Sequence, residues 1–261
     1  MNSVNKTLYI PLYGKAFVSK KGILLKDKKA EEIWEQAQFP LKRKSKSKWL
    51  AYTMAMRAAV FDSWVAERRA QDPSAIVLQL GCGLDGRIKR VGEGNSVWVD
   101  VDFPSVIEER KKYFSETECY QMLGADIKNP EFMKALPKAE RAIVVLEGVS
   151  MYLTNEDLKG TLAKISEYFP SVCVLVDCYT PFAAKMSKLK NPVGEVGVSK
   201  VYGVASERVL EEGTLLRFVK EHEMTPKALI EELSKAEQWI FKRLYAGKTA
   251  KKLYKIYEYE K

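Results

Sequence analysis

The sequence has no long apolar run. No uninterrupted apolar stretch in its 261 residues approaches the roughly 18 that a membrane span needs, and residues 1–6 lack the basic-then-apolar pattern of a signal peptide. Cysteine is scarce: Cys82, Cys119, Cys173 and Cys178 show no metal-ligand spacing and are too few for a disulfide framework. We therefore expect no membrane segment, no metal site and a cytoplasmic location.

Histidine is rarer still, because His222 is alone in the sequence. Hydride-transfer enzymes usually place a polar proton donor beside the carbonyl of their substrate. The Tyr-x-x-x-Lys pair that short-chain dehydrogenases use for this occurs only as Tyr257 and Lys261, at the end of the chain. These shortages disfavour an NAD(P)-dependent oxidoreductase, which stays open as an alternative.

Acidic residues are outnumbered, with 34 Asp and Glu against 43 Lys and Arg and a net charge of +9. Much of the excess lies in residues 41–48 and 248–255, and a basic patch can attract RNA or an anionic substrate. Aromatic residues are not interleaved with the first lysine run, as a groove for single strands requires. We interpret both runs as solvated surface and expect no nucleic-acid partner.

What is present predicts an α/β protein with a doubly wound, mostly parallel, Rossmann-like sheet of seven strands. Apolar runs predict strands at 75–80, 97–102, 119–123, 141–146 and 172–177, and two final strands, at 239–245 and 253–259, form a predicted hairpin. We expect a single domain. Its parts are a helical lid (1–72), a cofactor-binding core (73–180), a substrate-cap insertion (181–224) and a final helix with the hairpin (225–261).

The chain is organised around the first predicted core strand and the glycine-rich loop that follows it. Gly81 and Gly83 interrupt the apolar run, and glycine allows a sharp turn and close approach of a ligand to the backbone. With Gly86 they also match Gly-x-Gly-x-x-Gly, the dinucleotide fingerprint, which is weak by itself. The loop therefore predicts a nucleotide site without identifying the nucleotide.

Acidic residues follow three predicted strands: Asp102, Asp126 and Glu147. The carboxyl ends of parallel strands form the ligand edge of such a sheet. A carboxylate can accept hydrogen bonds from both ribose hydroxyls, and an acid after the third strand suits an adenine amine. This acidic lining favours S-adenosylmethionine, which carries a cationic sulfonium and no pyrophosphate, over a nicotinamide cofactor.

Several motifs resemble those of the leucine carboxyl methyltransferase family, which includes O-methyltransferases related to the tetracenomycin polyketide pathway. Leu80-Gly-Cys-Gly-Leu-Asp-Gly-Arg87 is similar to its Leu-Gly-Ala-Gly-Leu-Asp-Thr-Arg motif, although Gly86 lacks the threonine hydroxyl. Val101-Asp-Phe-Pro104, the segment from Glu147 to Leu153, Leu12-Tyr-Gly-Lys-Ala16 and Asp27-Lys-Lys-Ala30 match further motifs. The resemblance covers most of the chain to about Phe169. It implies a class I S-adenosylmethionine-dependent methyltransferase.

The resemblance also implies which residues bind the cofactor. Backbone at Gly81 and Gly83 lies along the methionine part. Asp102 holds the ribose, and Asp126 and Ile127 frame the adenine. Glu147 binds the methionine amino group, and Arg57 and Lys15 bind its carboxylate.

The methyl acceptor is the least determined part of the prediction. We expect a small-molecule carboxylate or hydroxyl, or a carboxyl terminus, held by Tyr152, Tyr202 and Arg217, and we name no catalytic residue. In-line positioning of acceptor and methyl does most of the work in such a transfer. A nucleic-acid methyltransferase is the remaining alternative. It is disfavoured because Glu147-Gly-Val-Ser150 stands where those enzymes carry an Asn/Asp-Pro-Pro-Tyr/Phe loop.

Overall fold

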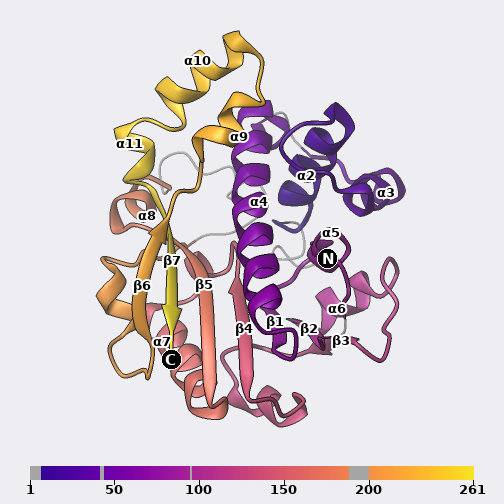
Figure 1. The fold of residues 1–261 in the computed structure, drawn as a ribbon. Helices are drawn as coiled ribbons and strands as arrows, with labels where there is room; N and C mark the ends of the chain where they lie inside the picture. Colours follow the sequence, from indigo (N-terminus) through magenta and orange to yellow (C-terminus); the bar gives the residue numbers. More distant parts are fainter. Residues whose placement is uncertain (1–6, 42–43, 95, 188–199) are drawn as a thin grey trace.

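A seven-stranded sheet forms the centre of the molecule, as the sequence predicts (Figure 1). The computed structural model describes residues 7–41, 44–94, 96–187 and 200–261. The strand order is β3-β2-β1-β4-β5-β7-β6. The strands are β1 (Ile76–Leu80), β2 (Trp98–Asp102), β3 (Tyr120–Gly124), β4 (Arg141–Leu146), β5 (Ser171–Tyr179), β6 (Arg217–His222) and β7 (Tyr254–Glu260).

The first five strands are parallel, and β1 lies between β2 and β4. Alternate residues of β1 point to opposite faces of the sheet: Leu78 and Leu80 join one apolar cluster, and Val77 joins the other. Both faces are covered, so the strand is apolar except for Gln79 and does not alternate with polar residues. This explains why continuous apolar runs located the core strands.

Helices cover both faces. On one face, α7 (Asn155–Tyr168) packs with the short helices η2 (Pro130–Ala135) and η5 (Glu207–Leu210). On the other, the long helix α4 (Lys48–Gln71) crosses the sheet (Figure 1). It is accompanied there by α2 (Tyr9–Lys21), α3 (Lys28–Ala37), α5 (Arg87–Val91) and α6 (Pro104–Arg110). This two-sided cover is the doubly wound arrangement that the strand–helix alternation predicts.

The amino-terminal helices, which the sequence analysis expects to be a lid, pack against one another and on one face of the sheet. The 3₁₀ turn η1 (Lys44–Lys46) leads into α4, and α2 packs along α4. Asp27 caps α3 by accepting a hydrogen bond of 2.8 Å from the amide of Ala30. A third apolar cluster joins α2 and α4 to α9 (Lys227–Glu231) and α10 (Lys235–Leu244). No helix within the described ranges is long and apolar enough to cross a membrane.

The predicted carboxyl-terminal hairpin is wrong. Residues 239–245 do not form a strand, because Lys235–Leu244 is the helix α10, capped by Ser234 and Glu237 and packed through Phe241. β6 comes instead from within the predicted insertion and pairs antiparallel with β7. After α10 the chain reaches β7 through α11 (Lys248–Lys251), and after β5 it forms α8 (Pro181–Ser187). Residues 188–199 of the predicted insertion lie outside the described residues.

Candidate active site

The glycine loop turns at the carboxyl end of β1, where the site is built. Gly81 and Gly83 have φ values of 70° and 51°, in the left-handed region that favours glycine. The amide of Gly81 donates a hydrogen bond of 2.7 Å to the carbonyl of Val101 in β2. A Cβ atom on Gly81 would lie 2.3 Å from Cγ2 of Val149, so the loop packs directly against the chain that follows β4.

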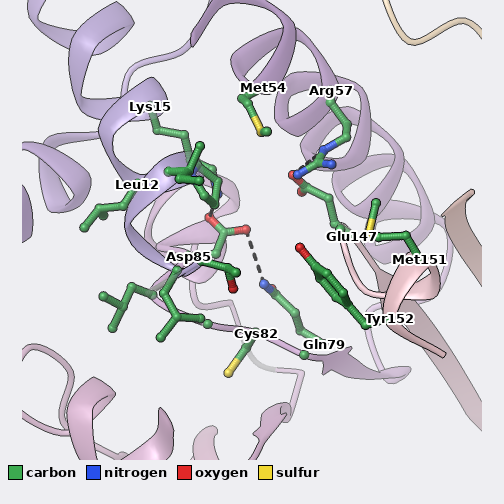
Figure 2. A pocket seen from close by; sticks show the side chains of 18 of the residues that line it. Leu12, Lys15, Met54, Arg57, Gln79, Cys82, Asp85, Glu147, Met151 and Tyr152 are labelled. Carbon is green, nitrogen blue, oxygen red and sulfur yellow. Dashed lines mark hydrogen bonds and ion pairs between the residues drawn. The ribbon is translucent and has the colours of Figure 1, made fainter. Parts of the chain in front are cut away.

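A pocket opens between this loop, the lid and the segment after β4 (Figure 2). It brings together residues that are distant in the sequence and that belong to α2, α4, the glycine loop and the turn after β4. Six of the predicted site residues line it: Lys15, Arg57, Gly81, Gly83, Glu147 and Tyr152.

Glu147 is held between two arginines. Its Oε1 accepts a hydrogen bond of 2.9 Å from Nε of Arg57, and its Oε2 accepts one from Arg87 at the start of α5. Burial raises the pKa of Glu147, but the positive charges of Arg57 and Arg87 outweigh burial and lower the pKa from 4.5 to about 2. Glu147 therefore presents a permanent negative charge at the pocket.

Asp85, within the glycine-rich motif, connects the lid to the loop. Nζ of Lys15 lies 2.7 Å from its Oδ1, Arg90 donates to the same oxygen at 2.7 Å, and Gln79 donates to Oδ2 at 3.2 Å (Figure 2). Burial raises the pKa of Asp85, but Arg90, Lys15 and Arg87 together hold it well below 3.8. Asp85 is not among the predicted site residues, although the match of the whole motif was the signal that could have found it.

Arg57 has two further neighbours that the sequence analysis missed. Its Nη1 donates a hydrogen bond of 2.6 Å to the hydroxyl of Tyr254 and lies 3.0 Å from Oδ2 of Asp177. Asp177 lies near the end of β5, so the rule that found the other strand-end acids could have found it as well. Nothing in the sequence near Tyr254 marks it.

Asp102 lies behind the loop at the end of β2. Its two oxygens accept hydrogen bonds of 2.8 Å each from the amides of Gly83 and Phe103. Burial raises the pKa of Asp102. Asp126 and Ile127 follow β3, the strand beside β2, and Asp126 accepts a bond of 3.0 Å from the amide of Lys128. These three residues do not line the pocket itself, but they lie along the same edge of the sheet.

The three predicted substrate residues are separated by the structure. The side chain of Tyr152, in η3 (Ser150–Tyr152), points into the pocket (Figure 2), and Tyr202 lies beside η3 because its amide donates to the carbonyl of Met151 at 2.8 Å. Arg217 begins β6 and pairs with Glu260, which pairs with Cys173 near the start of β5. Because β7 is antiparallel to β5, Arg217 lies at the opposite edge of the sheet, so its prediction is wrong.

His222 does not line this pocket, although the second cavity that it lines shares Tyr254 with it. Its Nε2 lies 2.5 Å from Oε2 of Glu258 in β7, and it lines a second cavity beside α11. No group of three or more His, Cys, Asp or Glu within residues 7–41, 44–94, 96–187 and 200–261 is placed to hold a metal ion.

Comparison with known proteins identifies relatives over most of the chain. A family model described as leucine carboxyl methyltransferase matches residues 3–166. The tetracenomycin polyketide synthesis O-methyltransferase TcmP of Streptomyces glaucescens is 28% identical over 243 residues, which cover 92% of this chain and 90% of that protein. The S-adenosyl-L-methionine-dependent methyltransferase dpfgK of Gibberella zeae is 28% identical over 136 residues, covering 48% of this chain and 45% of that protein.

Two solved structures share the fold. A DUF574-family protein from Streptomyces avermitilis superposes with a TM-score of 0.61 at 13% identity, covering 97% of each chain. Magnesium protoporphyrin IX methyltransferase from Synechocystis superposes with a TM-score of 0.53 at 10% identity, covering 95% of this chain and 99% of that chain.

Proposed function

The chain belongs to the leucine carboxyl methyltransferase family, and we propose that it is an O-methyltransferase acting on a small molecule. It is an S-adenosylmethionine-dependent methyltransferase. The observation that carries the proposal is the pairing of Glu147 with Arg57 at 2.9 Å, beside the glycine loop. The Glu147 carboxylate and the Arg57 guanidinium lie side by side, so they match the ammonium and carboxylate groups of the methionine part.

We assign each cofactor contact to a residue by its position. Glu147 faces the methionine amino group, Arg57 and Lys15 face its carboxylate, and the backbone of the glycine loop lies along it. Asp102 holds the ribose hydroxyls, with Asp126 and Ile127 at the adenine. S-adenosylmethionine supplies an electrophilic methyl group on a cationic sulfonium, which the acidic residues of the site favour.

The dinucleotide alternative has no support from the comparisons, because the matching family model and the relative TcmP are both methyltransferases. The charges of the loop do not decide the matter. Asp85 is ionised, but Lys15, Arg87 and Arg90 surround it, and Glu147 lies between Arg57 and Arg87. We do not retain the oxidoreductase alternative.

Between a carboxylate and a hydroxyl acceptor, we favour the carboxylate. The carboxylates of the described pocket lining, Asp85 and Glu147, have lowered pKa values, so they are weak bases. Burial raises the pKa of the lining residues Tyr152, Tyr179 and Tyr254, so they stay protonated. An acceptor hydroxyl would have to lose its proton, whereas a carboxylate attacks the methyl group without a base.

The roles of this chain's residues are then to bind and to orient. The acceptor oxygen displaces the neutral thioether in line, so alignment lowers the barrier without any proton transfer. The hydroxyl of Tyr152 points into the pocket and makes no hydrogen bond with any described residue, so we propose that it donates to the acceptor carboxylate (Figure 2).

A ligand comparison tests the proposal. We expect S-adenosylhomocysteine to raise the melting temperature of the purified protein, because a ligand that binds only the folded state stabilises it by about 2.7 kcal/mol at a hundredfold excess over Kd. NAD and NADP should give no shift. With radiolabelled S-adenosylmethionine and a panel of aromatic carboxylic acids and phenols, the label should enter base-labile methyl esters. A shift with NAD alone would contradict the proposal.

Asp102→Asn should weaken S-adenosylhomocysteine binding about tenfold or more. Each hydrogen bond to a charged carboxylate is worth about 1.5–3 kcal/mol, and the amide keeps only one acceptor oxygen. 5′-Methylthioadenosine retains the ribose and lacks the amino acid, so it should lose affinity equally. Calorimetry with both ligands measures this, and unchanged affinity for both would exclude Asp102 from the ribose site.

Glu147→Gln should weaken S-adenosylhomocysteine about tenfold or more, by removal of a charge-assisted bond. It should leave 5′-methylthioadenosine unaffected. The pKa of Glu147 is lowered, so its ionised form stabilises the fold above about pH 4.5, and this contribution is lost as the pH falls towards 2. The difference in free energy of unfolding between wild type and variant should therefore shrink over that range. A constant difference would contradict the paired, ionised state.

A further inference from the structure

The guanidinium of Arg57 is fixed on two of its three nitrogens. Nε donates to Glu147 at 2.9 Å, and Nη1 donates to the hydroxyl of Tyr254 at 2.6 Å and lies 3.0 Å from Oδ2 of Asp177. Nη2 makes no hydrogen bond with any of the described residues. It lies against Gly148, where a Cβ atom would come within 3.1 Å of it. One nitrogen of Arg57, at the pocket wall, is thus left for a ligand.

The two groups that hold Nη1 are themselves held. The hydroxyl of Tyr254 donates a hydrogen bond of 2.6 Å to Oδ2 of Asp177, and the amide of Gly148 donates one of 2.8 Å to Oδ1. Asp177 is fully buried, so both of its oxygens depend on these partners. The pair stands on neighbouring strands, because β5 and β7 run antiparallel with Tyr179 opposite Tyr254.

These contacts restrict which edge of the guanidinium meets Glu147. Arginine and a carboxylate favour a fork in which two nitrogens donate to two oxygens. Such a fork between Arg57 and Glu147 would use Nε together with Nη2. Oε2 of Glu147 instead accepts from Arg87, so Arg57 meets Glu147 through Nε alone, at 2.9 Å, while Nη1 is held by Tyr254 and Asp177.

We propose that Asp177 and Tyr254 are positioning residues for S-adenosylmethionine, which fix Arg57 so that Nη2 faces the methionine carboxylate. The proposal rests on the function proposed above and adds two residues to its site. Both lie beyond residue 166, where the family match ends. Their contribution is preorganisation, since an arginine side chain that is already ordered loses less freedom when the ligand binds.

Tyr254→Phe tests this with two ligands. Calorimetry should show S-adenosylhomocysteine binding about two- to tenfold weaker, which corresponds to the loss of one hydrogen bond. Binding of 5′-methylthioadenosine should not change, because that ligand has no carboxylate for Arg57. Asp177→Asn should weaken S-adenosylhomocysteine more than Tyr254→Phe does, again without effect on 5′-methylthioadenosine.

Tyr179→Phe is the matched control. Its ring lies edge-on to that of Tyr254 with centroids 5.1 Å apart, it lines the same pocket wall, and its hydroxyl makes no hydrogen bond with a described residue. Both ligand affinities should be unchanged in this variant. Thermal melts of each variant show whether it is folded. If Asp177→Asn does not fold, the result for Tyr254→Phe alone tests the positioning role.

The outcomes separate the inference from the proposed function. Equal weakening of both ligands by Tyr254→Phe, or no weakening of S-adenosylhomocysteine, would overturn the positioning role while leaving the methyltransferase intact. A wild-type protein that binds neither ligand would contradict the proposed function itself. Selective weakening of S-adenosylhomocysteine supports both.

Discussion

Gly81→Ala should abolish measurable S-adenosylhomocysteine binding and lower the stability of the fold. Alanine at a φ of 70° costs about 1–2 kcal/mol, because the left-handed conformation crowds its Cβ. That Cβ would also lie 2.3 Å from Cγ2 of Val149, 3.3 Å from its Cγ1 and 3.4 Å from its Cβ, so Val149 or the loop must move. A shift of about 1 Å in such a site can cost about a hundredfold in activity.

Gly213→Ala is the control for the conformational cost of alanine at a positive φ, without any steric contact of its Cβ. Gly213 has a φ of 74°, close to that of Gly81, and a Cβ there meets nothing within 4 Å. We expect this variant to lose only the conformational cost and to bind S-adenosylhomocysteine normally. Chemical denaturation and calorimetry measure both quantities. If the two variants are destabilised equally and both bind the ligand, the close approach of the loop to Val149 has no role in the site.

Arg110→Met should lower the free energy of unfolding by about 3–5 kcal/mol, the usual effect of leaving a buried charge unpaired. Arg110 and Asp100 are both fully buried and form an ion pair beneath the loop. Arg110 also donates hydrogen bonds to the hydroxyl of Tyr120 at 2.9 Å and to the carbonyl of Gly83 at 3.0 Å. Its loss therefore removes support from the cofactor loop as well.

A double-mutant cycle measures the coupling free energy between Asp100 and Arg110. Asp100→Leu combined with Arg110→Met should be less destabilised than the sum of the two single variants, because no buried charge remains. Full recovery is not expected, since the hydroxyl of Tyr120 loses both partners. Arg217→Met, at an exposed arginine, should change stability little. Additive effects in the cycle would show that Asp100 and Arg110 are not coupled.

The core strands could be predicted because burial on both faces leaves a pattern in the sequence itself. Residues 76–80 and 141–146 are apolar except for Gln79 and Arg141, since the two faces of these strands are covered. β6 lacks this pattern: it is an edge strand with mostly exposed side chains, Arg217-Phe-Val-Lys-Glu-His222. α10 was mistaken for a strand because Trp239, Ile240 and Phe241 are strand-favouring residues, while the burial of Gln238 and Phe241 follows the helical spacing.

The site residues also fall into those that could be located from the sequence and those that could not. Asp102, Asp126 and Glu147 could be located from the sequence because the ends of neighbouring parallel strands meet at one edge. Lys15 and Arg57 came from the family resemblance, since a basic residue on a lid helix carries no local mark of its target. Arg217 was misplaced because the direction of β6 decides at which edge of the sheet it lies.

The sequence by itself determined the five parallel strands, the glycine loop, the acidic strand ends and the class of cofactor, because each depends on residues close together in the chain. Only the tertiary structure decided what the charges do. Arg57 meets Glu147 across 90 residues and Tyr254 across 197. Such contacts depend on strand order and on the angle of α4 over the sheet. The physical reason is that a buried charge takes whichever partner the packing brings within reach, and local sequence does not encode that choice.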